Sequence, residues 1–164
     1  MYKHKMKDLN KIIIIGAGHA GVQVAATLRE NKYIGEIFLF DKDSNLPYQK
    51  PPLSKKFLLN EENNPSLLRS QEWYQNNNIK LLNNTTISKI DRTKKIILDL
   101  TGKKFSYDKL ILATGSFNKV LKDMDTSKYS NLINLRTLND SIKLKNLLIK
   151  SNNILILGAG FIGL

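Results

Sequence analysis

The sequence predicts an α/β protein built on a mostly parallel β-sheet, with a small antiparallel β meander. Residues 11–15 and 36–40 are short runs rich in β-branched and aromatic residues, which is typical of buried parallel strands. Between them, apolar residues recur at helical spacing, namely Val22, Ala25, Ala26 and Leu28. Several short β-prone segments then follow between residues 79 and 107, and turn signals separate them as in hairpins.

The turn between the first strand and the first helix is rich in glycine. Residues 16–21 read GAGHAG, which is the pattern G-x-G-x-x-G. Gly16 permits the tight turn, Gly18 lets a diphosphate approach the backbone, and Gly21 lets the helix pack close to the strand. The N-terminus of the helix offers free N–H groups and its positive dipole end to the phosphates. Strand, turn and helix together indicate dinucleotide binding rather than an ordinary glycine-rich turn.

Composition limits the class of protein. The 164 residues are enough for about one domain with a real core. No apolar run approaches the ~18 residues that span a bilayer, and the basic residues 1–7 precede an apolar run too short for a signal peptide. We therefore expect a cytoplasmic protein. The absence of cysteine excludes disulfides, thiolate zinc sites, cysteine-ligated iron–sulfur clusters and redox dithiols within this chain.

The chain is strongly basic. Its formal charge is +12, from 26 Lys and Arg against 14 Asp and Glu. The lysines are scattered singly or in pairs, and no RNA- or DNA-binding motif accompanies them. We therefore expect a basic composition spread over the surface and no nucleic-acid partner, with an acidic protein partner as the alternative explanation.

Two acidic residues follow the second predicted strand. In a dinucleotide-binding fold, a carboxylate near the end of this strand binds a ribose hydroxyl, about 20 residues after the glycines. Asp41 and Asp43 both lie near that offset, and either could make the contact. Each could equally be a solvated acid in a loop.

The most distinctive stretch is LPYQKPPLSKKFLL, at residues 46–59. Pro51 and Pro52 restrict the backbone, and Pro52 suits the first turn of a short helix. Lys55 is therefore aimed by a rigid segment, and a cation beside a flavin would stabilise its reduced, anionic form. By composition alone, the stretch could be a proline loop with solvated lysines.

The glycine pattern followed by P-Y-x-K-P-P-L-S-K resembles the FAD-dependent ferredoxin reductases of the pyridine nucleotide–disulfide oxidoreductase superfamily. This group includes the reductases that feed oxygenases and cytochromes P450, and the apoptosis-inducing factor. The resemblance implies a three-layer FAD/NAD(P)-binding, Rossmann-like fold, with FAD as cofactor and NAD(P)H as co-substrate. It implies that electrons pass from NAD(P)H through FAD to ferredoxin or rubredoxin.

The resemblance also implies which residues contact FAD. Lys55 falls on the family's lysine beside the flavin ring, and Ala20 falls on a FAD contact in the glycine turn. Lys42 falls where many members carry an acid that contacts the cofactor. Because of this departure, Asp41 or Asp43 would have to supply the ribose contact.

Two later segments also match FAD-contacting positions. Ile87 falls on a position that lines the adenine pocket through its backbone, although its residue type alone suggests a core residue. Residues 109–115, KLILATG, predict a buried strand and resemble the superfamily's second FAD motif. In that motif the turn passes close to the cofactor, where Thr114 offers a hydroxyl and Gly115 permits a tight turn.

Two further helices are expected. The first covers residues 65–75, and its inward-facing side chains are Leu67, Leu68 and Trp73. The second runs to residue 148, and Asn139 or Asp140 would cap it. Arg136 lies just before this helix and falls on the family's FAD-contacting arginine, whose fork of donors suits phosphate or flavin oxygens. By residue type alone it is a surface arginine.

Residues 153–163, NILILGAGFIG, predict a second strand and a second G-x-G-x-x-G, formed by Gly158, Gly160 and Gly163. By the resemblance, this motif opens the NAD(P)H domain. We therefore expect residues 1–150 to be the N-terminal part of an FAD-binding domain with its linking helix. Residues 151–164 would be the truncated start of an NAD(P)H-binding domain. We expect the rest of that domain, a later FAD segment and the C-terminal interface domain to be missing.

Three functions are therefore compared. The first is the N-terminal fragment of a flavoprotein reductase, inactive alone, and the second is a non-catalytic FAD- or nucleotide-binding fragment from a truncated or split gene. The third, an NAD-binding enzyme such as a short dehydrogenase, lacks the support of residues 47–55 and 109–115. Hydride transfer requires no catalytic acid, base or nucleophile, so His4 and His19 are expected to be incidental, and no metal site is expected.

Overall fold

The computed structural model describes residues 11–61, 63–119, 128–158, 160 and 163. It consists of two compact units. The first unit comprises the described parts of Met1–Tyr48 and Leu67–Gly115, and it contains the glycine turn of residues 16–21. The second comprises those of Gln49–Ser66 and Ser116–Leu164, and it contains Lys55. Each unit is described by itself below.

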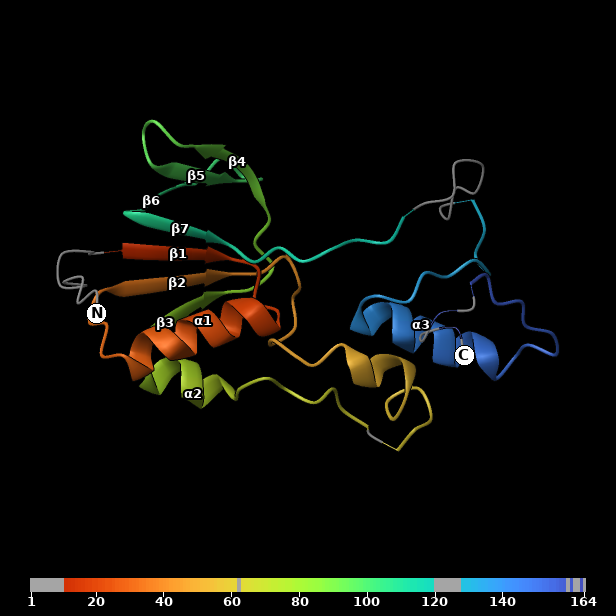
Figure 1. The fold of residues 1–164 in the computed structure, drawn as a ribbon. Coiled ribbons are helices and arrows are strands. Elements are labelled where there is room, and N and C mark those ends of the chain that lie inside the picture. The colour runs from red at the N-terminus through yellow and green to blue at the C-terminus, as the bar shows by residue number, and fades with distance from the viewer. Residues whose placement is uncertain (1–10, 62, 120–127, 159, 161–162, 164) are drawn as a thin grey trace. The chain divides into compact units, whose positions relative to one another are not determined.

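The first unit is organised around a parallel sheet, whose strands are among the arrows in Figure 1. The strand order is β3-β2-β1-β7, and every pairing is parallel. The strands are β1 (Lys11–Ile15), β2 (Glu36–Phe40), β3 (Ile79–Leu82) and β7 (Lys109–Leu112). The strand predicted at residues 11–15 is therefore confirmed as an interior strand. This position explains its run of isoleucines, because Ile13 and Ile14 are fully buried on opposite faces.

Two different layers cover the faces of this sheet. On one face, Ile12 and Ile14 pack with α1 (His19–Glu30) and α2 (Gln71–Asn76), and Tyr74 is the buried residue of α2. On the other, Ile13 packs with the meander, whose strands are β4 (Ile87–Asp91), β5 (Ile96–Asp99) and β6 (Lys104–Ser106). The meander is antiparallel, in the order β4-β5-β6. The predicted three-layer α/β fold is confirmed.

The helix predicted at residues 65–75 was wrong over its first half. The helix α2 begins after Ser70, whose hydroxyl accepts a hydrogen bond from the Trp73 N–H at 3.3 Å. Leu67 instead forms an isolated antiparallel bridge with Tyr48, so its backbone is extended and its side chain is exposed. Leu68 and Trp73 pack against the core as expected.

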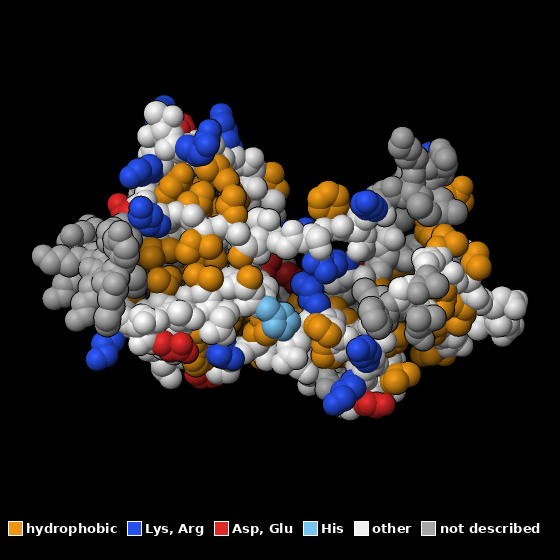
Figure 2. All heavy atoms as spheres, in the orientation of Figure 1, with side chains coloured by type: hydrophobic (Ala, Val, Ile, Leu, Met, Phe, Trp, Pro, Cys, Tyr) orange, Lys and Arg blue, Asp and Glu red, His pale blue; other side chains and the backbone are white. Residues whose placement is uncertain are grey.

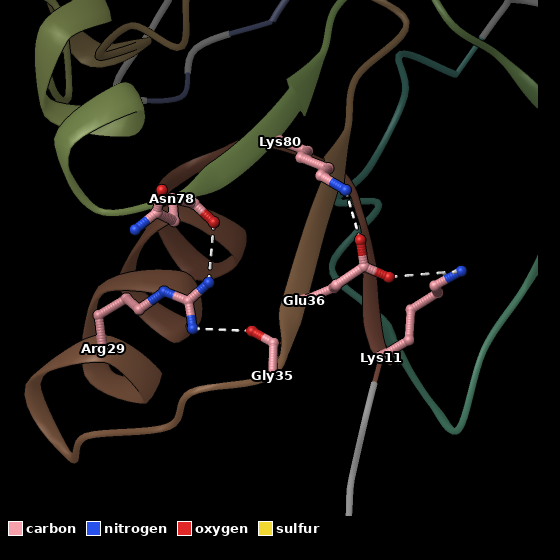
Figure 3. Close-up of polar contacts among 6 residues, drawn as sticks. All are labelled: Lys11, Arg29, Gly35, Glu36, Asn78 and Lys80. Atoms are coloured by element: carbon pink, nitrogen blue, oxygen red, sulfur yellow. Dashed lines mark hydrogen bonds and ion pairs between the residues drawn. The ribbon is translucent and has the colours of Figure 1, made fainter.

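Polar contacts tie the strands together at the amino end of the sheet (Figure 3). The guanidinium of Arg29, on α1, donates to the carbonyl oxygens of Gly35 at 2.9 Å and Asn78 at 2.8 Å. Glu36 lies between Lys11 and Lys80 and pairs with both. The hydrogen bond from Lys80 is the main cause that lowers the pKa of Glu36. These contacts lie at the opposite end of the strands from the glycine turn.

The second unit contains the short 3-10 helix η2 (Pro51–Ser54) and the helix α3 (Leu138–Leu148), which contact each other. The prediction that Pro52 lies in the first turn of a short helix is confirmed. The predicted cap of α3 needs correction, because Thr137 is the N-cap residue. Asp140 joins it in a capping box, in which the Thr137 N–H donates to Asp140 Oδ2 at 2.7 Å.

The strand predicted at residues 153–157 is absent from the structure, which shows no strand between residues 151 and 158. A strand requires a neighbour to pair with, and none of the described residues pairs with this segment. Its apolar side chains are consequently exposed, by 57% to 84%, at Ile154, Leu155, Ile156 and Leu157. Its proposed assignment to a second domain stays a prediction.

Lysine and arginine side chains lie in small groups over several elements on the face shown in Figure 2, rather than in one block. Among the helices that the structure describes, none is long and apolar enough to cross a membrane.

Candidate functional site

The glycine turn is wedged between the ends of β2 and β7. Gly16 has a φ of +104°, which L side chains rarely adopt. A β-carbon at Gly16 would lie 2.2 Å from the carbonyl oxygen of Ala113. The Gly16 N–H donates to the carbonyl of Phe40 at 2.8 Å, and the Ala113 N–H donates to that of Ile15 at 2.8 Å. Only glycine fits at position 16.

The other two glycines of the turn differ sharply in their surroundings. A β-carbon at Gly21 would lie 1.9 Å from the carbonyl oxygen of Gly16, so Gly21 sets the close packing of α1 on the turn. Around Gly18, by contrast, no atom lies within 4 Å of the β-carbon position. Gly18 is the N-cap of α1, with no side-chain cap and no acidic residue in the first turn. The first N–H groups of this helix thus face an open space that suits an anion.

Asp41 forms hydrogen bonds both with the glycine turn and with the loop after β2. Its Oδ2 accepts a hydrogen bond from the Ala17 N–H at 3.2 Å, and its Oδ1 accepts one from the Asp43 N–H at 3.1 Å. Sequence reasoning identified the acid but missed this link to the turn. The available signal was the position of an aspartate directly after a strand, where its side chain readily accepts backbone N–H bonds.

Asp43 is held within the following loop. Its Oδ1 accepts from the Asn45 N–H at 3.0 Å, and its Oδ2 accepts from the Tyr48 hydroxyl at 2.8 Å. Lys42, between the two acids, is exposed. The loop is pinned to the end of β3, because the Thr85 N–H donates to the carbonyl of Asp41 at 2.8 Å.

The segment after β7 adjoins the glycine turn. Ala113 is the residue against which Gly16 packs, and the Thr114 nitrogen would lie 3.0 Å from a β-carbon on Gly16. Thr114 and Gly115 are exposed, and Gly115 has a φ of +67°. The structure therefore brings together three segments predicted from separate parts of the sequence, at the carboxyl ends of β1, β2 and β7. Ligands of open parallel sheets bind at this end of the strands.

Ala20 and Ile87 differ in exposure. Ala20 is exposed on the first turn of α1, beside Gly18. Ile87 begins β4, opposite Asp99, and its side chain packs against the cluster of Ile13 and Phe40. The side chain of Ile87 is therefore a core group, and its backbone role in an adenine pocket stays a prediction.

Lys55 and Arg136 lie in the second unit. Lys55 follows η2 directly, with an exposed side chain and an N–H that donates to the carbonyl of Pro52 at 3.0 Å. Arg136 is half-buried, and its N–H donates to Asp140 Oδ2 at 3.1 Å. Their contacts with a cofactor stay predictions.

Comparison with known proteins decides the family. Residues 10–164 match the family described as pyridine nucleotide-disulphide oxidoreductase. The chain belongs to this family. The resemblance drawn from the glycine turn and from residues 46–59 is thereby confirmed.

Individual members of the family align with most of this chain. It is 42% identical over 154 residues to the rubredoxin-NAD(+) reductase of Ectopseudomonas oleovorans, covering 93% of this chain and 40% of that protein. The ferredoxin reductase for the CYP199A2 system from Rhodopseudomonas palustris has a TM-score of 0.87 at 37% identity, covering 94% and 38% of the two chains. A putidaredoxin reductase, solved as a covalent complex with putidaredoxin, has a TM-score of 0.79 at 33% identity, covering 85% and 34%. The chain thus spans well under half the length of these family members.

The second glycine pattern of this family member repeats part of the geometry of the first. Gly158 has a φ of +114°, and a β-carbon at Gly163 would lie 2.2 Å from the carbonyl oxygen of Gly158. Gly160, like Gly18, has no atom within 4 Å of its β-carbon position. Unlike Gly16, Gly158 has no atom within 4 Å of that position either. Among the described residues, Gly158 therefore has no neighbouring strand like the one that encloses Gly16.

The described residues of this chain give no support for a catalytic histidine or for a metal site. His19 is exposed on the first turn of α1, and His4 lies outside the described residues. Within the described ranges, no group of three or more His, Cys, Asp or Glu residues could hold a metal ion.

Proposed function

We propose that this chain is the FAD-binding N-terminal part of an NAD(P)H-dependent flavoprotein reductase. The whole enzyme would pass electrons from NAD(P)H to a small acidic electron-transfer protein, ferredoxin or rubredoxin, in the cytoplasm. The observation that carries the proposal is the joining of the open Gly18 position, Asp41 and the Ala113–Thr114 backbone at one end of the sheet. It is supported by the family, whose matched members are rubredoxin, ferredoxin and putidaredoxin reductases.

The residues present fit the diphosphate half of FAD. The open space at Gly18 leaves room for phosphate oxygens, and the N–H groups of the first turn of α1 would donate to them. Asp41 or Asp43 would accept a hydrogen bond from the ribose. The Thr114 hydroxyl, exposed beside the turn, would offer a further donor.

The second unit would serve the flavin half. When bound, FAD accepts a hydride and releases single electrons, so the protein contributes position and electrostatics. Lys55 would stabilise negative charge on the reduced ring system, and Arg136 would direct its guanidinium donors at phosphate or flavin oxygens. Gly158, Gly160 and Gly163 would begin the NAD(P)H site. The formal charge of +12 would favour association with an acidic electron carrier.

FAD binding tests the proposal directly. We expect FAD, but not FMN, to be retained after reconstitution, because the glycine turn is suited to a diphosphate. The measurement is flavin fluorescence and the absorbance of the purified protein, made on the 164-residue chain and on any longer form encoded downstream of Leu164. A longer form that cannot be loaded with FAD would overturn the proposal.

A second candidate is a non-catalytic FAD- or nucleotide-binding fragment. An NAD(P)H–ferricyanide assay on the 164-residue chain with added FAD separates the candidates. We expect no turnover above the free-flavin background from this chain, and turnover only from a longer form. Turnover by the 164-residue chain itself would mean that it holds a nicotinamide site.

A further inference from the structure

We propose that Ser141 is a positioning residue that holds the segment carrying Lys55 in place, through a buried hydrogen bond from α3 to η2. The inference rests on the proposed function, because it concerns the lysine expected beside the flavin. It involves contacts within the second unit alone.

The hydrogen bond joins two buried groups that are far apart in the sequence. Ser141 Oγ donates to the carbonyl oxygen of Leu53 at 2.7 Å. Ser141 is 0% exposed and Leu53 is 2% exposed. A buried hydroxyl without a partner would be costly, so this bond specifies which carbonyl of η2 lies against α3. Because η2 is only one short 3-10 turn, its own hydrogen bonds hold it weakly.

A second contact from the same face of α3 lies on the other side of Lys55. Lys145 Nζ lies 3.8 Å from the centroid of the Phe57 ring, which is a cation–π contact. Ser141 and Lys145 are four residues apart on α3 and therefore share one face. Leu53 and Phe57 flank Lys55 on either side, so both ends of the short segment that carries the lysine are fixed to α3.

The direction of the Lys55 side chain is set by the backbone of this segment. Its side chain is exposed, and its N–H and that of Phe57 both donate to the carbonyl of Pro52 at 3.0 Å. A shift of η2 on α3 would therefore move the origin of the Lys55 side chain. Ser141 does not touch the reacting groups and acts only through this segment.

Hydrogen exchange tests the positioning role on the chain itself, without any cofactor. In Ser141→Ala, we expect the amides of Lys55 and Phe57 to exchange about tenfold faster, because the Leu53 carbonyl loses its buried donor. The matched control is Ser151→Ala, since Ser151 Oγ also donates to a carbonyl, that of Leu147 at 2.7 Å, but at an exposed site. Exchange in the control should be unchanged around Lys55. Unchanged exchange in Ser141→Ala would overturn the proposal.

A second pair of variants covers the case in which Ser141→Ala does not fold, which the amides of α1 would report. Lys145→Gln removes the cation–π contact, and Lys145→Arg retains it. We expect faster exchange at Phe57 in Lys145→Gln and recovery in Lys145→Arg. Equal exchange in the two variants would overturn the role of the α3 face.

The consequence for the flavin is tested by epistasis in an FAD-loaded longer form. We expect Lys55→Met and Ser141→Ala each to lower the flavin midpoint potential, and the double variant to match Lys55→Met alone. If Lys55→Met lowers the potential but Ser141→Ala does not, the positioning role fails while the proposed function stands. If Lys55→Met leaves the potential unchanged, the role of Lys55 beside the flavin fails, and hydrogen exchange alone decides whether Ser141 holds the segment.

Discussion

Asp41 Oδ2 accepts a hydrogen bond from the Ala17 N–H at 3.2 Å, so the acid that follows β2 braces the glycine turn that follows β1. An acid in this place has two separable roles, one in the shape of the turn and one toward a ribose. Asp43 is held by Asn45 and Tyr48 within the following loop.

Asp41→Ala should lower the free energy of unfolding by about 1–3 kcal/mol, because the N–H groups of Ala17 and Asp43 lose their acceptor. FAD affinity should fall as well, since the turn loses its brace. The measurements are urea unfolding, with exposed Lys42→Ala as its matched control, and FAD titration. Equal unfolding free energies for Asp41→Ala and Lys42→Ala would show that the brace contributes nothing.

The glycines of the turn should respond differently to the same added methyl group. Gly16→Ala should prevent stable folding of the first unit, because its β-carbon would meet the Ala113 carbonyl at 2.2 Å and φ is +104°. Gly18→Ala should fold normally, because its φ is −74° and the space is open. It should nevertheless weaken FAD binding by about tenfold or more, since the methyl group occupies the room for a phosphate.

Thermal unfolding and FAD titration measure these two effects separately. Gly160→Ala is the matched control, because Gly160 holds the corresponding place in the second glycine pattern and also faces open space. It should bind FAD as the unchanged protein does. Full FAD affinity in Gly18→Ala would remove the proposed diphosphate position.

The hydroxyl of Tyr74 is buried and has no hydrogen-bond partner among the residues that the structure describes. Burial is the main cause that raises the pKa of Tyr74 to about 12, with Asp41 adding to the effect and Arg69 opposing it. Removing the hydroxyl should therefore cost nothing, and Tyr74→Phe should unfold at the same or a higher urea concentration. A loss of more than about 1 kcal/mol would reveal a hydrogen bond to that hydroxyl.

The same shift in pKa predicts a dependence on pH. The folded state keeps the Tyr74 proton up to a higher pH than the unfolded state, whose tyrosine titrates near 10. The stability present below about pH 10 should therefore fall as the pH rises from about 10 to 12. Tyr74→Phe should lose this component, which urea unfolding across that range would measure. An identical pH profile in the variant would contradict the assignment.

The exposed apolar run at residues 154–157 should cause self-association of the 164-residue chain, because clustered apolar side chains favour contact with another molecule. Removal of residues 151–164 should reduce this association, as size-exclusion chromatography with light scattering would show, without lowering FAD affinity. Leu155→Lys, at the most exposed of these positions, should have a weaker effect in the same direction. If association is undiminished after the removal, the surface that causes it lies elsewhere in the chain.

Most of the fold could be predicted because its signals are local. The isoleucines of β1, the helical spacing in α1 and the short strands of the meander are each readable within a few residues. The failures arose where a partner decides the outcome. Residues 65–70 form no helix, since Leu67 pairs with Tyr48 instead, and residues 153–157 form no strand because no described residue pairs with them.

The residues of the candidate site also differ in how far they could be predicted from local sequence. The glycine turn could be predicted from its own pattern, whereas Lys55 and Arg136 entered mainly through the resemblance to a family. The hydrogen bonds from Ala17 to Asp41 and from Ser141 to Leu53 could not be predicted, because each joins segments that meet only after the chain has folded.

The contact between Gly16 and Ala113 also bears on the order of events during synthesis. The glycine turn follows β1 near the start of the chain, but one of its walls is the backbone after β7, which leaves the ribosome much later. Pairing of β1 with β7 is a long-range step, and such steps are slow compared with formation of α1. A nascent chain that has completed the glycine turn, α1 and β2 therefore has no finished binding site. We therefore expect a dinucleotide to bind, and to stabilise the chain, only after β7 has paired with β1.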